Sequence, residues 1–147
     1  MPRRRYAFVD FLPGKIREPT GRIMLPIRIV NPHNGAAWPT YGLLDTGATT
    51  CLFPGALATQ LGLNLKGDGV KSSVTSGIEQ KRLPTFLHTF RIELLSPDGA
   101  RTVWQSKNVP INCVEHNPPI LLGYREFLRH FDTCAIHYPA QEIEMVW

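Results

Sequence analysis

The stretch YGLLDTGATTCLF, Tyr41 to Phe53, places a single carboxylate inside an otherwise apolar segment. Asp45 follows two leucines, and a hydroxyl residue, a glycine and a small residue come directly after it. Burying an ionised carboxylate costs free energy unless hydrogen bonds or function compensate. Thr46 supplies a hydroxyl group, and Gly47 allows a tight turn that brings backbone N–H groups close to the acid. The pattern therefore predicts a carboxylate held rigidly at the base of a cleft.

A single aspartate does not suffice for acid–base hydrolysis, whereas two carboxylates that share a proton do. None of the chain's other aspartates lies in a matching context; they are Asp10, Asp68, Asp98 and Asp132. The stretch FDTC, 131–134, comes closest, but Cys134 stands where a glycine is required. We therefore expect a second identical chain, related by a two-fold axis, to supply a second Asp45.

The composition predicts one β-rich domain. A chain of 147 residues suits a single domain, and an apolar content of 43% with 19% charged residues suits a folded core. The 13 prolines and 12 glycines fall between short apolar runs, which is typical of β-structure with many turns. We expect the domain to cover residues 1–147, with 1–20 as an N-terminal extension.

Alternating apolar residues predict about ten short strands. Ile23, Leu25, Ile27 and Ile29 indicate a strand with one buried face, and turn residues at 31–39 fold the chain back into a second strand ending at Asp45. Phe86 to Leu94 alternate in the same way, and residues 70–83 are polar and predict an exposed hairpin. A turn at 96–100 leads into the segment 101–106, and further strands are expected at 49–53, 109–114, 133–138 and 142–147 and from Pro118 onward.

Two segments have helical character. Residues 54–63 predict a brief helix that begins after Pro54 and ends near Gly62. In the segment 118–131, an apolar strand changes to helical spacing, with four large apolar residues on one side: Tyr124, Phe127, Leu128 and Phe131.

Two motifs together resemble those of the retropepsin-like aspartic proteases, the family that includes retroviral proteases. LLDTGATTCLF is similar to the active-site motif of the family. ILLG, 120–123, followed by YREFLRHF, is similar to its second signature, in which two apolar residues and a glycine precede a short helix. The resemblance covers residues 23–147. It implies an all-β, closed-barrel acid-protease fold with one short C-terminal helix, assembled as a two-fold homodimer to which the extension 1–20 is a candidate contributor.

The resemblance also implies residue roles. Asp45 is the catalytic carboxylate, one per subunit, Thr46 bonds across the two-fold axis, and Gly47 approaches the substrate backbone. The hairpin near Val74–Ile78 is a flap that closes over the peptide, and Gly123 packs against the Asp45 loop. The implied substrate-binding residues are Ala48, Thr49, Val74, Thr75, Ser76, Gly77, Ile78, Leu121 and Leu122.

The expected activity is hydrolysis of peptide bonds by a water activated between two copies of Asp45, without metal or organic cofactor. The expected partners are a polypeptide substrate and a second copy of the chain. A catalytically silent, dimeric peptide-binding module on the same fold is the alternative. The stretch SSVTSGIEQ, 72–80, lacks the several glycines of a viral flap tip, and GYREFL is one residue longer than the viral equivalent.

Other patterns in the sequence give weaker support to other kinds of site. Cys113–His116 and Cys134–His137 share a C-x₂-H spacing suited to zinc, but residues three apart on a strand point to opposite faces. Nothing in the sequence activates Cys51 as a nucleophile. Arg3–Arg5 form no continuing basic stripe, so nucleic acid is not an expected partner. No run reaches the ~20 apolar residues of a membrane span. The chain has three cysteines, an odd number, and they lie far apart in the sequence, which favours reduced thiols and a cytoplasmic setting.

Overall fold

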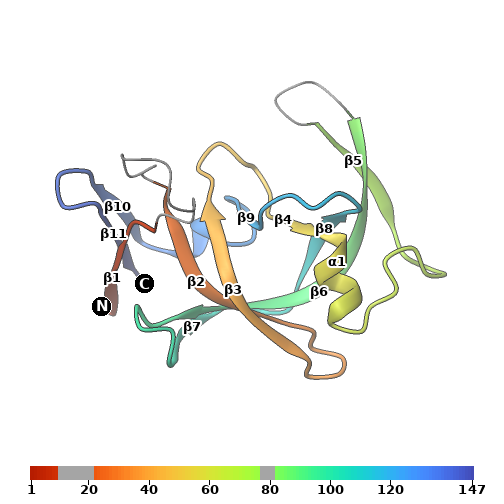
Figure 1. The fold of residues 1–147 in the computed structure, drawn as a ribbon, viewed down its shortest axis with the longest axis horizontal. Helices are drawn as coiled ribbons and strands as arrows, with labels where there is room; N and C mark the ends of the chain where they lie inside the picture. Colours follow the sequence, from red (N-terminus) through yellow and green to blue (C-terminus); the bar gives the residue numbers. More distant parts are fainter. Residues whose placement is uncertain (10–21, 77–81) are drawn as a thin grey trace, which may run out of the picture.

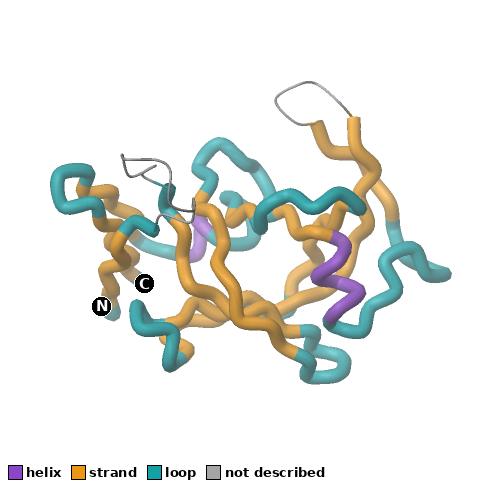
Figure 2. The backbone as a smooth tube through the Cα atoms, viewed as in Figure 1, coloured by secondary structure: helices purple, strands orange, loops and turns teal. Residues whose placement is uncertain are grey.

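The computed structural model describes residues 1–9, 22–76 and 82–147. The regular structure of this part of the chain is mainly strand (orange in Figure 2), with little helix. The strands are β1 (Arg3–Ala7), β2 (Met24–Val30), β3 (Ala37–Leu44), β4 (Leu52–Pro54), β5 (Ser72–Ser76), β6 (Arg82–Leu95), β7 (Thr102–Gln105), β8 (Val109–Val114), β9 (Leu121–Leu122), β10 (Thr133–His137) and β11 (Glu142–Val146). The helices are α1 (Gly55–Gln60) and a 3₁₀ helix (Leu128–His130). None in the described ranges is long and apolar enough to span a bilayer.

The larger sheet has the strand order β2-β3-β9-β4-β8-β6-β5, with β7 on β6. β2 pairs with β3 and also with β6, so it has neighbours on both edges. β9 lies parallel to β3 and antiparallel to β4, which brings residues 121–122 between the two strands that flank the Asp45 loop. This central position of β9 arranges the candidate site.

A smaller sheet, of order β1-β11-β10, joins the two ends of the chain (Figure 1). Arg3 lies opposite Val146, and the Arg5 guanidinium forms a 2.9 Å ion pair with Glu144. The Tyr6 hydroxyl donates a 2.8 Å hydrogen bond to the carbonyl oxygen of Leu95 at the end of β6. The small sheet is thereby attached to the large one through a buried contact.

The expected β2–β3 hairpin is confirmed. Leu25, Ile27 and Ile29 of β2 have no exposed surface. The Asn31 N–H donates to the carbonyl oxygen of Ala36 across the turn, where Gly35 adopts a φ of 75° that favours glycine.

The core is built from side chains of β2, β4, α1, β6, β8, β9 and β11, together with Phe127 and Phe131. Its largest fully buried side chains are Leu25, Ile27, Ile29, Phe53, Phe90, Ile92, Leu94, Ile111, Leu122, Phe127, Ile143 and Met145. The predicted buried face of β6 is confirmed for His88, Phe90, Ile92 and Leu94, whereas Phe86 is only half-buried. The alternation ends at Ile92, because Glu93 and Leu95 are buried as well.

The short helix predicted over 54–63 is confirmed as α1, and Gly62 follows it with a φ of 84°. The C-terminal helix expected at 124–131 is wrong in type, because only the 3₁₀ helix Leu128–His130 forms. Phe127 has φ −129° and ψ −71°, which breaks α-helical geometry directly before it. The strand expected at 49–53 starts only at Leu52, because residues 49–51 bend around the loop that follows Asp45.

Candidate active site

Asp45 comes directly after the last residue of β3. Leu43 and Leu44 pair in parallel with Leu121 and Leu122 of β9, and the Asp45 N–H donates a 3.1 Å hydrogen bond to the carbonyl oxygen of Leu122. Leu44 and Leu122 are buried, whereas Asp45 is half-buried. The strand pairing therefore anchors the backbone on one side of the acid and leaves its side chain at the surface of the core.

The carboxylate is oriented by its own loop. The Gly47 N–H donates to Asp45 Oδ1 at 3.0 Å, and the Ala48 N–H donates to the Asp45 carbonyl oxygen at 3.2 Å. A backbone donor on one carboxylate oxygen restricts the rotation of the side chain. Gly47 is not among the glycines with positive φ in the described chain, so the turn does not itself demand a glycine. Thr46, Gly47 and Thr49 are exposed, and Ala48 is half-buried.

A second segment, Gly123 to Glu126, forms hydrogen bonds with the Asp45 loop. The N–H groups of Tyr124 and Arg125 donate to the carbonyl oxygens of Ala48 and Thr49, each at 2.9 Å. A Cβ atom on Gly123 would collide with the backbone carbonyl of Thr50. The expected packing of Gly123 against the Asp45 loop is confirmed.

Glu126 and Cys51 complete this attachment, and no motif in the sequence predicted a role for Glu126. The Cys51 N–H donates to Glu126 Oε2 at 2.8 Å, and the Gly123 N–H donates to Cys51 Sγ at 3.2 Å. The only sequence signal for Glu126 is that it is the one carboxylate between the apolar residues of YREFLRHF. Burial raises the pKa of the Cys51 thiol to about 12, with the nearby Glu126 acting in the same direction and the Gly123 N–H opposing it. Cys51 is therefore a packing residue and a poor nucleophile.

The hairpin of β5 and the start of β6 projects to the same side of the molecule as the loop between β3 and β4 (Figure 1). Val74 has 59% of its surface exposed and pairs with Pro84, and Thr75 and Ser76 continue the strand. Gly77 and Ile78 lie outside the described residues. The exposed hairpin predicted over 70–83 is confirmed as far as the described ranges extend.

Leu121 and Leu122 differ in accessibility. Leu121 is half-buried and pairs with both Leu43 and Leu52. Leu122 has no exposed surface and packs closely on Gly42, where a Cβ atom would lie 2.7 Å from the leucine side chain. Of the two, Leu121 carries the surface that a ligand can reach.

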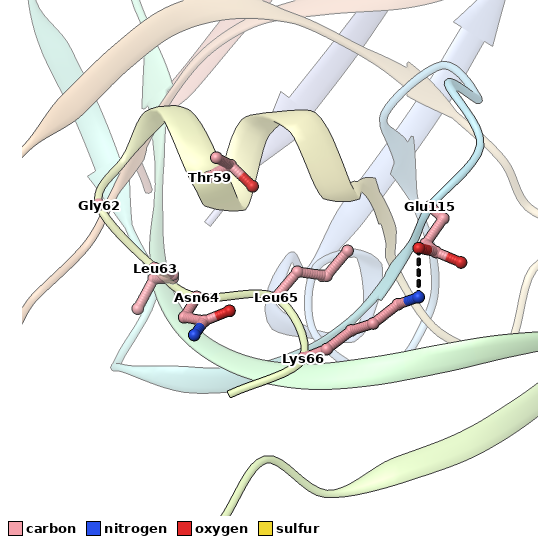
Figure 3. Close-up of a pocket in the computed structure, with 7 residues that line it drawn as sticks. All are labelled: Thr59, Gly62, Leu63, Asn64, Leu65, Lys66 and Glu115. Carbon is pink, nitrogen blue, oxygen red and sulfur yellow. Dashed lines mark ion pairs between the residues drawn. The ribbon is translucent and has the colours of Figure 1, made fainter. Parts of the chain in front are cut away.

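The two C-x₂-H pairs lie in different sheets, on or beside β8 and on β10. Within the described ranges, no three His, Cys, Asp or Glu side chains come close enough together to hold a metal ion. A cavity of about 510 Å³ beside α1 is lined in part by Thr59, Leu65 and Lys66, and there Lys66 Nζ forms a 2.5 Å ion pair with Glu115 (Figure 3).

Solved structures of other proteins share this architecture. A retropepsin-like aspartic protease from Rickettsia conorii superimposes with a TM-score of 0.64, over 98% of this chain and 89% of its own, at 16% sequence identity. The chain adopts a retropepsin-like fold. EIAV protease complexed with the inhibitor HBY-793 is 17% identical and covers 76% of this chain and 88% of its own, with a TM-score of 0.49. No family model and no curated protein sequence matches the chain.

Within this retropepsin-like fold, the described aspartates other than Asp45 lie on different elements. Asp98 accepts a hydrogen bond from Ser96 in the turn between β6 and β7. The Asp132 N–H donates to Val146 in the small sheet, and Asp68 lies in an exposed turn after α1. Asp45 is thus the only aspartate of the described chain on the loop between β3 and β4.

Proposed function

We propose that the protein is an aspartic endopeptidase that works as a two-fold homodimer, with one Asp45 from each copy. The observation that carries this proposal is the fixed Asp45 carboxylate, which accepts the Gly47 N–H on a loop held by Gly123–Glu126 within a retropepsin-like fold. A two-fold axis next to this loop supplies the second carboxylate that the chain does not place there itself. The pairing of β2 with both β3 and β6 supports the closed barrel that belongs to this proposal.

The proposed chemistry uses the two carboxylates in opposite protonation states. The ionised Asp45 removes a proton from a water molecule while its oxygen attacks the scissile carbonyl carbon, and the protonated Asp45 donates its proton to the carbonyl oxygen. Collapse of the resulting diol breaks the C–N bond, and the leaving nitrogen takes a proton from a carboxyl group. The water supplies all of the added atoms, so the reaction requires neither a metal nor an organic cofactor.

The solvent exposure of the residues around Asp45 supports the roles that we propose for them. Thr46 and Gly47 are exposed beside Asp45, where Thr46 meets its counterpart across the axis and Gly47 admits the substrate backbone. Ala48, Thr49 and Leu121 form the floor, and the hairpin that includes Val74, Thr75, Ser76, Gly77 and Ile78 covers an extended polypeptide. We assign Leu122 to the support of this floor because it is buried.

The cysteines bear on the location of the protein. Cys51 and Cys113 are buried, Cys134 is half-buried, and all three are free thiols. Free thiols of this kind suit a reducing compartment. We therefore place the proposed enzyme in the cytoplasm, which fractionation with an antibody against the chain tests directly.

The decisive experiment compares wild type with Asp45→Asn on a diverse peptide library from acidic to neutral pH, with cleavage measured by mass spectrometry. Asp68→Asn is the matched control, because it makes the same chemical change in an exposed turn. We expect cleavage by wild type and Asp68→Asn and none by Asp45→Asn, with unchanged unfolding curves. Cleavage by pure Asp45→Asn contradicts the mechanism. Peptide binding without cleavage by wild type points to a silent binding module.

A further inference from the structure

A cavity of about 610 Å³ lies against Arg125 and Glu126 of the Gly123–Glu126 segment. It is lined by the loop between β7 and β8 and by the turn after β9. We call it the basic cavity, after Lys107, Arg125 and Arg129 in its wall. Its volume falls within the range of small-molecule pockets, roughly 300–1,000 Å³, and exceeds what one bare inorganic ion fills.

The charges around the basic cavity are unbalanced. Lys107, Arg125 and Arg129 are exposed, and none of them forms an ion pair within the described part of the chain. The one acid in the wall, Glu126, is 9% exposed and its Oε2 already accepts the Cys51 N–H. The cavity beside α1 differs, because there Glu115 pairs with Lys66 (Figure 3). Unpaired guanidinium and ammonium groups around one space bind carboxylate and phosphate groups.

The wall of the basic cavity also has a fixed aromatic part. The Trp104 ring lies 4.7 Å from that of Phe131 and 5.5 Å from that of Phe127, measured between centroids. Trp104 itself is half-buried, so one part of the indole stays accessible while its neighbours hold it in place. Such a surface favours contact with an apolar or aromatic group.

We propose that the basic cavity binds a ligand that presents a carboxylate or phosphate group on an aromatic or apolar body. The anionic group lies between Lys107, Arg125 and Arg129, and the body lies against Trp104. This site is separate from Asp45, and its existence does not depend on the proposed protease activity.

The backbone connects the two sites. Arg125 and Glu126 line the basic cavity, and the same two residues bond to Thr49 and Cys51 through the Arg125 N–H and Glu126 Oε2. A ligand that draws the Arg125 side chain toward itself therefore acts on the segment that holds the Asp45 loop. Occupancy should shift the backbone amides of residues 48–51 as well as those of the cavity wall.

The first test is a ¹H–¹⁵N titration of the full chain with phenyl phosphate and phenylacetate, which share a ring and differ in the anion. Inorganic phosphate and benzyl alcohol supply the anion and the ring separately. We expect saturable shifts of the Trp104 indole N–H and of the Arg125 and Thr49 amides with at least one ring-bearing anion, and at least tenfold weaker binding of both fragments. The stronger of the two anions identifies the preferred group. No saturable binding at millimolar concentration overturns the proposal.

Variants then locate the site. Arg129→Gln and Lys107→Gln should each weaken binding of the better ring-bearing anion about tenfold, the size expected for a lost charge-assisted hydrogen bond. Arg101→Gln is the matched control, because Arg101 is an exposed arginine in another turn and is not part of the cavity wall. If Arg101→Gln weakens ligand binding equally, or if the largest chemical shift changes lie away from Trp104, the attraction is non-specific and the proposed site is refuted.

Discussion

A Cβ atom on Gly123 would collide with the backbone carbonyl of Thr50 and lie 3.0 Å from the carbonyl oxygen of Ala48. Backbone atoms cannot rotate away as a side chain does, so the Asp45 loop has to move if Gly123 becomes alanine. We expect Gly123→Ala to lower the free energy of unfolding by about 1–3 kcal/mol, as overpacking generally does. Urea unfolding at fixed protein concentration measures this change.

Gly47→Ala is the comparison for that substitution. A Cβ atom on Gly47 would meet only Asp45 Oδ1, at 3.4 Å, and the residue is exposed. Its unfolding free energy should stay within about 0.5 kcal/mol of wild type. Equal destabilisation by both alanine variants would contradict the steric account of Gly123. Because Gly47 is where we propose that the substrate backbone approaches, its alanine variant should cleave peptides at least tenfold more slowly.

These residues differ in how far the sequence predicts them. Asp45, Thr46 and Gly47 form one short motif, and Gly123 follows two leucines that make its partner motif recognisable. The hydrogen bond between Glu126 and Cys51 joins residues 75 positions apart, and neither residue type predicts it. A contact of this kind depends on the parallel pairing of β3 with β9, which a single sequence does not specify.

Among the secondary structure elements, β2, β6 and β7 share one charged cluster. Arg28 of β2 forms a 2.5 Å ion pair with Glu93 of β6, and Arg91 and Thr102 also bond to that carboxylate. Burial raises the pKa of Glu93, but the hydrogen bonds from Arg28, Thr102 and Arg91 outweigh burial and hold the pKa below its usual value. A carboxyl group with a lowered pKa stabilises the fold above its unfolded-state pKa, and that contribution disappears as the pH falls through the folded-state value.

Glu93→Gln should therefore cost about 1–3 kcal/mol of unfolding free energy at pH 7. The difference from wild type should shrink below about pH 4, because the unfolded carboxyl group binds a proton at a higher pH than the folded one. Urea unfolding from acidic to neutral pH measures this. Glu115→Gln serves as control, because the side chains of Glu115 and Lys66 are 49% and 53% exposed and such pairs contribute less than about 1 kcal/mol. A pH-independent loss in Glu93→Gln would contradict the electrostatic account.

The element that the sequence predicted wrongly is the helix at 124–131. Its spacing reflects burial only in part, since Phe127 and Phe131 pack into the core whereas Tyr124, expected on the same side, is 56% exposed. Their neighbour Trp104 belongs to β7, however, and the backbone at Phe127 leaves helical geometry. Periodicity reports which side chains are buried, and it cannot separate a helix from a turn whose aromatic residues pack on another strand.

At the scale of the whole molecule, the two ends of the chain already pair within one copy. β1 lies on β11, and β10 covers the other edge of β11. In the proposed homodimer, the outer edges of β1 and β10 are the strand edges of this small sheet that are open to a second copy. The sequence indicated terminal strands, but it left open which of them pair within the chain, because strand partners are set by contacts far apart along it.

The proposed sharing of one active site by two copies makes a quantitative prediction about mixed dimers. If each site needs Asp45 from both copies, a dimer of one wild-type and one Asp45→Asn chain is inactive. Equal mixing with free exchange leaves about one quarter of the dimers fully wild type, so cleavage per dimer should fall to about one quarter of the wild-type value. Two independent sites would instead retain about one half of the activity.

Mixing wild type with Asp68→Asn controls for exchange itself and should retain full activity. Analytical ultracentrifugation at the same concentrations establishes whether dimers are present. Retention of one half with dimers present would show that each copy carries a complete site, and the second acid would then have to come from the same chain.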